Sequence, residues 1–290
     1  PRKARSADCS RLSQDTAYFQ APMSAIVVAV ANQKGGVGKT TTTVNLGAAM
    51  AASGIPTLIA DLDPQANATS ALGAEKTPDA GVYAPLTGRA AATDRVIATR
   101  LPNLWLLPSE LDLAAAEMEL AGQPDYLLKL RACLANLKAD YGLGLILVDC
   151  PPTLGLLSMN ALCAADSLLV TLQCEYLALE GLGQILGVVE QLRTSGANPD
   201  LNVGGIVMTM FDNRTRLSYD VWEEVGRHYP KLMFHTAVPR SVRLSEAPSF
   251  GQTIFEYDPG GAGAQAYRAL ASEVAGRLLA PASGSAPTAP

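Results

Sequence analysis

The feature that most constrains the fold of this chain is a glycine-rich loop between an apolar run and a helical pattern. The apolar, largely β-branched run 26–31 stops at the segment 32–41, which reads Asn-Gln-Lys-Gly-Gly-Val-Gly-Lys-Thr-Thr. A strand, a glycine-rich turn and a helix in this order are the context in which a backbone cradles phosphate groups. The glycines let backbone amides converge on an anion, and the first turn of the helix adds its free amides and positive dipole end. The sequence therefore predicts a nucleotide phosphate site here.

Two side chains of this segment complete the expected site. Lys39 is expected to reach the β- and γ-phosphates, and the hydroxyl of Thr40 to bind Mg²⁺. A glycine-rich turn that binds nothing is the alternative, but it does not explain why strand, spacing, lysine and threonine occur together. The residues expected to contact the nucleotide are Gly35, Gly36, Val37, Gly38, Lys39, Thr40 and Thr41.

A second lysine, Lys34, precedes the first glycine, where the general phosphate-loop pattern requires none. Together with the segment 36–41, it resembles the deviant Walker A loop of the ParA/MinD superfamily of dimerising ATPases. The resemblance implies ATP and Mg²⁺ as cofactors. It also implies that Lys34 crosses a dimer interface to the phosphates bound by the partner subunit. A solvated loop lysine is the alternative.

Another apolar run ends in a carboxylate. The continuous run 143–148 is followed by Asp149, which is the general form of a Walker B motif. A strand that is apolar throughout belongs in the middle of a parallel sheet, because both its faces are buried. Asp149 is therefore expected to accept hydrogen bonds from Mg²⁺-bound water.

A shorter strand, 57–60, ends in the sequence Asp61-Leu62-Asp63-Pro64-Gln65. In open α/β sheets the carboxyl ends of the strands line the ligand crevice. The Asp-x-Asp-Pro-Gln pattern again resembles the ParA family, which implies that Asp63 positions the attacking water and that Asp61 lies close to the Mg²⁺ shell. Two solvated turn aspartates are the alternative.

The rest of the chain alternates strands with helices. Strands are expected over 104–108, 167–172 and 203–210, and helices over 40–53, 125–141, 177–195 and 264–279, with another helix beginning at Ser109. This alternation predicts an α/β fold, a mostly parallel doubly wound sheet with helices on both faces, of the P-loop NTPase type with a deviant Walker A motif. The expected domains are a disordered basic extension over 1–22, an ATPase domain over 23–279, and a disordered tail over 280–290.

Composition restricts the partners and the compartment. The net charge of −5 means that nucleic-acid binding needs a local basic patch. Five cysteines without a C-x-x-C pair indicate neither a disulfide framework nor a zinc site, so a reducing cytoplasm fits best. No apolar segment approaches the ~20 residues that span a membrane. Nothing after Gly276 has the character of the basic amphipathic helix with which MinD holds membrane, so no membrane partner is expected.

The segment 212–243 carries most of the basic side chains that could contact DNA. Aspartates and glutamates are interspersed, so composition alone describes a solvated surface of mixed charge. The resemblance implies that Arg214 and Arg243, and less directly Arg216 and Arg240, hold DNA without reading its sequence. It also implies that Pro239 packs against the adenine.

The resemblance to ParA covers about 23–279 and implies an ATPase for chromosome or plasmid segregation. The implied catalytic residues are Lys34, Lys39 and Asp63. ATP would drive a sandwich homodimer that binds double-stranded DNA non-specifically, and a ParB-type centromere-binding partner would stimulate slow hydrolysis and release. The expected location is the cytoplasm, associated with the nucleoid.

Three alternatives remain open at this point. The chain could be a related ATPase that positions another cargo or regulates a division site. It could resemble nitrogenase iron protein, in which case cysteines such as Cys133, Cys163 or Cys174 would hold a cluster. It could also be a nucleotide-dependent scaffold without turnover.

Overall fold

The structure is a computed structural model that describes residues 25–176 and 178–279. The expected basic extension, 1–22, and the expected tail, 280–290, lie outside the described residues. Within the described part of the chain, no helix is long and apolar enough to cross a membrane.

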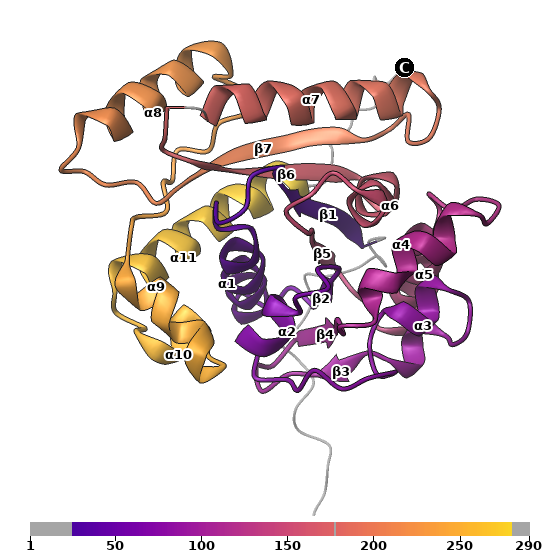
Figure 1. The fold of residues 1–290 in the computed structure, drawn as a ribbon. Coiled ribbons are helices and arrows are strands. Elements are labelled where there is room, and N and C mark those ends of the chain that lie inside the picture. Colours follow the sequence, from indigo (N-terminus) through magenta and orange to yellow (C-terminus); the bar gives the residue numbers. More distant parts are fainter. Residues whose placement is uncertain (1–24, 177, 280–290) are drawn as a thin grey trace, which may run out of the picture.

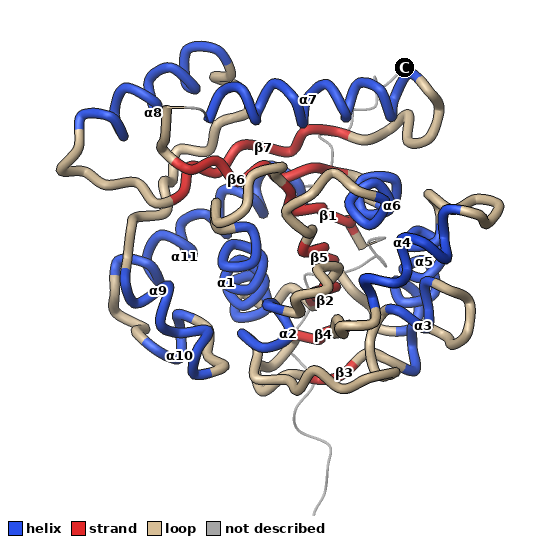
Figure 2. Tube along the Cα trace, in the orientation of Figure 1, coloured by secondary structure: helices blue, strands red, loops and turns tan. Residues whose placement is uncertain are grey.

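A seven-stranded sheet forms the centre of the molecule, with strand order β3-β4-β2-β5-β1-β6-β7. Every neighbouring pair is parallel except β3 and β4, which are antiparallel. Figures 1 and 2 show this sheet running through the molecule between two layers of helices. The strands are β1 (Ile26–Ala31), β2 (Thr57–Asp61), β3 (Ile97–Ala98), β4 (Leu104–Leu107), β5 (Leu145–Asp149), β6 (Ser167–Gln173) and β7 (Asn202–Thr209).

Helices cover both faces of the sheet, as the sequence predicted. In β1, Val28 and Val30 face one hydrophobic core, and Val27 and Ala29 face the other, because successive side chains of a strand point to opposite faces. The first core is covered by α1 (Lys39–Ala52), α2 (Asn67–Ala71), α9 (Val242–Glu246), α10 (Ile254–Tyr257) and α11 (Ala262–Val274). The second core is covered by α3 (Tyr83–Leu86), α4 (Leu113–Ala121), α5 (Lys129–Asp140), α6 (Leu156–Ala164), α7 (Ala178–Thr194) and α8 (Arg216–His228).

Some boundaries differ from the expected ones. The helix expected to begin at Ser109 begins at Leu113, because the Ser109 hydroxyl, which could have capped a helix, donates instead to the carbonyl of Asp63. The helix expected from Asp125 begins at Lys129, since Asp125 has a left-handed backbone with φ 55°. The last helix ends at Val274 and continues as a π-helical turn over Ala275–Leu279.

Candidate functional site

The glycine-rich loop joins β1 to α1, as the sequence predicted. Gly36 and Gly38 have φ of 74° and 84°, a region that side chains with a Cβ rarely adopt. Gly38 precedes the first residue of α1, and its carbonyl accepts the amide of Thr42 at 2.9 Å. The loop therefore turns directly into the amino end of a 14-residue helix, where free amides favour an anion.

Side chains from the neighbouring strands hold this loop in place. The amide of buried Asn32 donates to the carbonyl of Thr171 in β6 at 2.6 Å, and its side-chain oxygen accepts the backbone amide of Lys34 at 3.1 Å. Thr209, the last residue of β7, donates to the carbonyl of Val37 at 2.8 Å. The loop is thus tied to two strands that follow it by more than 130 residues.

Lys39 lies inside the loop. Its side chain is largely buried, and its ammonium donates to the carbonyl of Lys34 at 3.0 Å. Burial lowers the pKa of Lys39, and the carboxylate of Asp149 opposes that shift. Among the described residues this ammonium donates to its own loop alone, which is consistent with the expectation that it neutralises phosphate charge.

Asp149 lies at the carboxyl end of β5, beside the start of α1. Its two oxygens accept the hydroxyls of Thr40, at 2.7 Å, and Thr43, at 3.1 Å. Asp149 is fully buried; burial raises its pKa, and the carboxylate of Asp61 raises it further. A divalent cation relieves such repulsion, and hydroxyl and carboxylate oxygens suit Mg²⁺. The residues present therefore fit Mg²⁺, which Thr40 would hold directly with Asp149 behind it.

Asp61 pairs with Asp149 in the register of β2 and β5, but its carboxylate turns into its own loop. One oxygen accepts the amide of Asp63 at 3.2 Å, and the other accepts the amide and the hydroxyl of Thr69 at 2.8 and 2.7 Å. Burial raises the pKa of Asp61, and the hydrogen bonds from Thr69 oppose that shift. One oxygen of Asp61 is thus engaged by the loop that carries Asp63 and the other by α2.

The side chain of Lys34 pairs with a residue outside the loop that it belongs to. Its ammonium forms an ion pair with Glu175, which follows β6, and the two side chains are 51% and 41% exposed. An ion pair with this much exposure contributes little to stability, because water solvates both charges well when they separate. Lys34 can therefore leave Glu175 at small cost.

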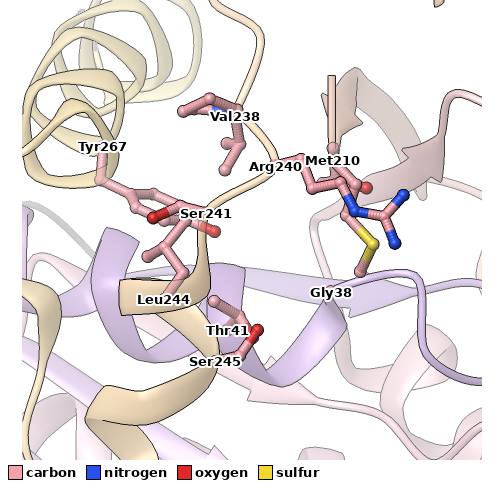
Figure 3. Close-up of a pocket in the computed structure, with 11 residues that line it drawn as sticks. Gly38, Thr41, Met210, Val238, Arg240, Ser241, Leu244, Ser245 and Tyr267 are labelled. Carbon is pink, nitrogen blue, oxygen red and sulfur yellow. The ribbon is translucent and has the colours of Figure 1, made fainter. Parts of the chain in front are cut away.

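A cavity of about 130 Å³ lies beside the start of α1 (Figure 3). Gly38 and Thr41 line one side, and Met210, Pro239 and Tyr267 line others. Met210 has a left-handed backbone, with φ 52°, directly after β7. Pro239, expected to pack against an adenine, thus lies next to the phosphate loop although the two are 200 residues apart in sequence.

The expected DNA-binding arginines lie on two segments that the fold joins. The carbonyl of Val238 accepts the amide of Phe211 at 3.0 Å, and the amide of Arg240 donates to the carbonyl of Phe211 at 3.0 Å. Arg214 donates three hydrogen bonds to the carboxylate of Asp212, two from its guanidinium at 2.9 and 2.7 Å and one from its backbone amide at 3.0 Å. The guanidinium of Arg214, and to a smaller extent that of Arg240, holds the pKa of Asp212 well below its usual range.

The other two arginines are also close to carboxylates. Arg216 lies 3.8 Å from Asp220 and is 92% exposed. Arg243 lies 3.2 Å from Glu246, and its guanidinium stacks over the ring of Tyr257 with 5.8 Å to the ring centre. A phosphate group must therefore compete with carboxylates of the same chain for Arg214, Arg216 and Arg243.

Most of the described cysteines are buried. Cys163 and Cys174 are buried, and Cys133 is partly exposed. Burial raises the pKa of Cys133 to about 11 and that of Cys174 to about 12. Cys163 and Cys174 do not lie on the surface, where a cluster shared by two subunits would be held, so their positions do not favour the alternative that resembles nitrogenase iron protein.

Comparison with known proteins identifies the family. Residues 25–203 match a family model described as an AAA domain. The chain is 47% identical over 250 residues to the sporulation initiation inhibitor protein Soj of Bacillus subtilis, covering 86% of this chain and 98% of Soj. It is 44% identical over 252 residues to the chromosome partitioning protein ParA of Caulobacter vibrioides, covering 87% of this chain and 94% of that protein.

The chain belongs to the ParA/Soj family of chromosome-partitioning ATPases.

Solved structures agree with the ParA/Soj assignment at the level of the fold. Cobyrinic acid a,c-diamide synthase from Mycobacterium smegmatis, solved with ADP and magnesium, is similar with a TM-score of 0.74 and 36% identity, covering 86% of this chain and 93% of that one. The septum site-determining protein MinD of Pyrococcus horikoshii, complexed with Mg-ADP, has a TM-score of 0.70 and 25% identity, covering 86% and 96%.

Several residues of this ParA/Soj chain were missed by sequence reasoning. Thr43 and Thr69 bind the buried carboxylates, Ser109 binds the loop of Asp63, and Glu175 pairs with Lys34. Ser109 directly follows the strand expected over 104–108, at the edge where ligands bind in α/β sheets, and this signal could have marked it. The partner of Lys34 had no comparable signal.

Proposed function

We propose that this ParA/Soj chain hydrolyses ATP with Mg²⁺ to drive chromosome or plasmid segregation. The observation that carries the proposal is the meeting of the phosphate loop, Asp149 and the Asp63 loop at one edge of the sheet. β1, β2 and β5 are adjacent and parallel, so their carboxyl ends bring these three groups together. The identity to Soj and ParA supports the biological role.

Within this proposal each residue has a distinct task in phosphoryl transfer. Lys39 and the loop amides hold the phosphates, Thr40 and Asp149 hold the metal site, and Asp63 orients the attacking water. Mg²⁺, when bound, supplies positive charge next to the phosphates. Asp63 is nearly buried, and one of its oxygens accepts the amide of Gln65 at 2.9 Å, so its orientation is restricted. We assign Asp63 to orienting water rather than to accepting its proton.

Dimerisation is the expected effect of ATP on this chain. Lys34 is half exposed and only weakly held by Glu175, so its ammonium is available to the phosphates bound by a second copy. If each nucleotide site is completed by the partner subunit, ATP binds the dimer more tightly than the monomer, and ATP binding therefore favours self-association. ATP thereby becomes the signal for the homodimer.

The output of the dimer is non-specific binding to double-stranded DNA. Arg214, Arg216, Arg240 and Arg243 are available to phosphates, and two copies double their number. Their carboxylate neighbours and the net charge of −5 weaken binding by one copy alone. We further propose that a ParB-type protein stimulates hydrolysis and returns the chain from the nucleoid to the cytoplasm.

The test is release of phosphate from Mg-ATP by the purified chain, alone, with non-specific DNA, and with DNA plus the ParB-type protein encoded beside its gene. Slow release alone and faster release with both additions is the expected result. The Lys39→Ala variant measures the background of phosphate release that does not depend on the phosphate loop. Release that neither addition accelerates would contradict the partitioning role, and would favour a positioning ATPase that responds to another cargo.

A further inference from the structure

A buried hydrogen-bond network fixes the loop that carries Asp63. The hydroxyl of Ser109 donates to the backbone carbonyl of Asp63 at 2.7 Å, and the amide of Ser109 donates to the hydroxyl of Thr69 at 2.9 Å. The same Thr69 hydroxyl donates to Asp61 at 2.7 Å. Asp61 and Thr69 are fully buried, and Ser109 is 1% exposed. No bulk water can therefore replace a missing partner in this network.

The network joins three separate elements around one short loop. Asp61 ends β2, Thr69 lies in α2, and Ser109 follows β4. The loop is also closed on itself, since the amide of Asp63 donates to Asp61 at 3.2 Å and the amide of Ala66 donates to the carbonyl of Asp63 at 2.8 Å. The backbone of Asp63 is thus held from the side of its own strand, from α2 and from β4.

We propose that Thr69 and Ser109 are positioning residues for Asp63, and that Asp61 serves this network rather than the Mg²⁺ shell. The inference rests on the proposed function, because it assigns a task to residues that hold the water-orienting carboxylate. Each member of the network uses its polar atoms on another member. Removal of the Thr69 hydroxyl leaves the buried amide of Ser109 without its partner, and removal of the Ser109 hydroxyl takes one of two donors from the carbonyl of Asp63, so the loop rearranges.

Loss of this network is expected to slow the chemical step without weakening the binding of ATP. Displacing a catalytic group by about 1 Å can reduce a rate ~100-fold while leaving substrate binding intact. The phosphate loop and its ties to β6 and β7 do not include Thr69 or Ser109, so nucleotide binding is independent of the network. Loss of the Thr69 hydroxyl is therefore expected to lower kcat and to leave the KM for ATP unchanged.

The experiment compares Thr69→Val, Ser109→Ala and Thr69→Ser with the wild-type chain, by phosphate release in the presence of DNA and the ParB-type partner. Thr69→Val is expected to lower kcat by at least about tenfold at unchanged KM, and Ser109→Ala to lower it in the same way. Thr69→Ser keeps the hydroxyl and is expected to restore the wild-type rate. Because both residues act through one network, the double variant is expected to lose less than the product of the two single losses.

Thr57→Val is the matched control. Thr57 is also a buried threonine, but it begins β2, at the end of the strand opposite Asp61, and its hydroxyl donates to the carbonyl of Ile55 at 2.8 Å. This variant loses a buried hydroxyl without touching the loop of Asp63. Its kcat is expected to match the wild-type value, even if its melting temperature falls as much as that of Thr69→Val.

Three outcomes would overturn the inference. The first is equal kcat for Thr69→Val and Thr57→Val while Asp63→Ala is impaired, which leaves the proposed function standing. The second is recovery of the kcat of Thr69→Val at high Mg²⁺ concentration, which would mean that Asp61 acts in the Mg²⁺ shell. The third is unchanged phosphate release by Asp63→Ala, which removes the water-orienting role and the inference together.

Discussion

Ala66 has the most unusual backbone in the loop that carries Asp63. It is fully buried and has φ 50° and ψ 44°, the left-handed conformation, immediately before α2. A Cβ in this region costs about 1–2 kcal/mol, whereas glycine adopts it without strain. The surrounding hydrogen bonds of Asp61, Thr69 and Ser109 hold the backbone in this conformation.

Ala66→Gly is therefore expected to stabilise the protein slightly. Relief of the left-handed strain exceeds the roughly 0.4–1 kcal/mol lost through the greater freedom of the unfolded chain. The net gain in free energy of unfolding is expected to be under about 1 kcal/mol, measured by denaturant titration. Ala71→Gly, a buried helical position of α2, serves as control and is expected to lose about 1 kcal/mol. Equal losses for both variants would contradict the assigned strain.

At the scale of elements, α1 lies close against the sheet because Gly47 has no side chain. A Cβ added at Gly47 would lie 2.7 Å from Cδ1 of Ile59 in β2 and 3.4 Å from Cδ1 of Leu147 in β5. Both residues are fully buried, so they have little room to move. The distance between α1 and the sheet also places the phosphate loop over the strand ends.

Gly47→Ala is expected to destabilise the protein by about 1 kcal/mol. Overpacking costs about 1–3 kcal/mol, and the higher helix propensity of alanine offsets part of this. Gly183→Ala in α7 is the matched control, because a Cβ there has no neighbour within 4 Å. This control is expected to gain roughly 0.5–1 kcal/mol. Thermal unfolding of both variants provides the measurement, and a gain for Gly47→Ala would mean that α1 has room to move.

At the scale of the whole molecule, the proposed dimer depends on Lys34. Lys34→Ala is expected to abolish dimerisation by ATP, measured by light scattering, while the monomer still binds nucleotide through Lys39. Glu175→Gln removes the partner of Lys34 within the subunit, and it is expected to leave the dimer intact. If Lys34→Ala formed dimers of normal stability, the proposed contact of Lys34 with the phosphates of the partner subunit would be contradicted.

DNA binding is also a property of the assembled molecule. Arg243→Glu is expected to weaken binding to all DNA sequences alike, and to reduce the slope of log affinity against log salt by ~0.9 for each phosphate that the variant no longer neutralises. Arg89→Glu is the matched control: Arg89 also pairs with a carboxylate, that of Glu119 at 2.8 Å, and follows α3 on the opposite face of the sheet. Filter binding over a salt series measures both, and a sequence-selective loss in Arg243→Glu would contradict backbone binding.

The fold and the centre of the site were predictable because their signals are local. A strand, a glycine-rich turn and a helix within 26–53 define the phosphate loop, and carboxylates after apolar runs mark the strand ends. Parallel pairing then places Asp61 and Asp149 side by side at one edge. The helix start expected at Ser109 was wrong because the Ser109 hydroxyl donates to the carbonyl of Asp63, 46 positions away in sequence, and does not cap a helix.

The sequence by itself determined where the glycine-rich loop forms and which residues it places at the start of α1, since their spacing along one strand, loop and helix sets their geometry. Only the tertiary structure decided how the other groups are used. In the folded chain Asp61 accepts a hydrogen bond from Thr69, and Lys34 forms an ion pair with Glu175, 141 positions away in sequence. Arg243 pairs with Glu246 and lies over the ring of Tyr257. For Asp61 the physical reason is that a buried carboxylate must find a partner wherever packing supplies one. Lys34 and Arg243 are exposed, and their pairs follow from the segments that packing brings together, which no local pattern relates.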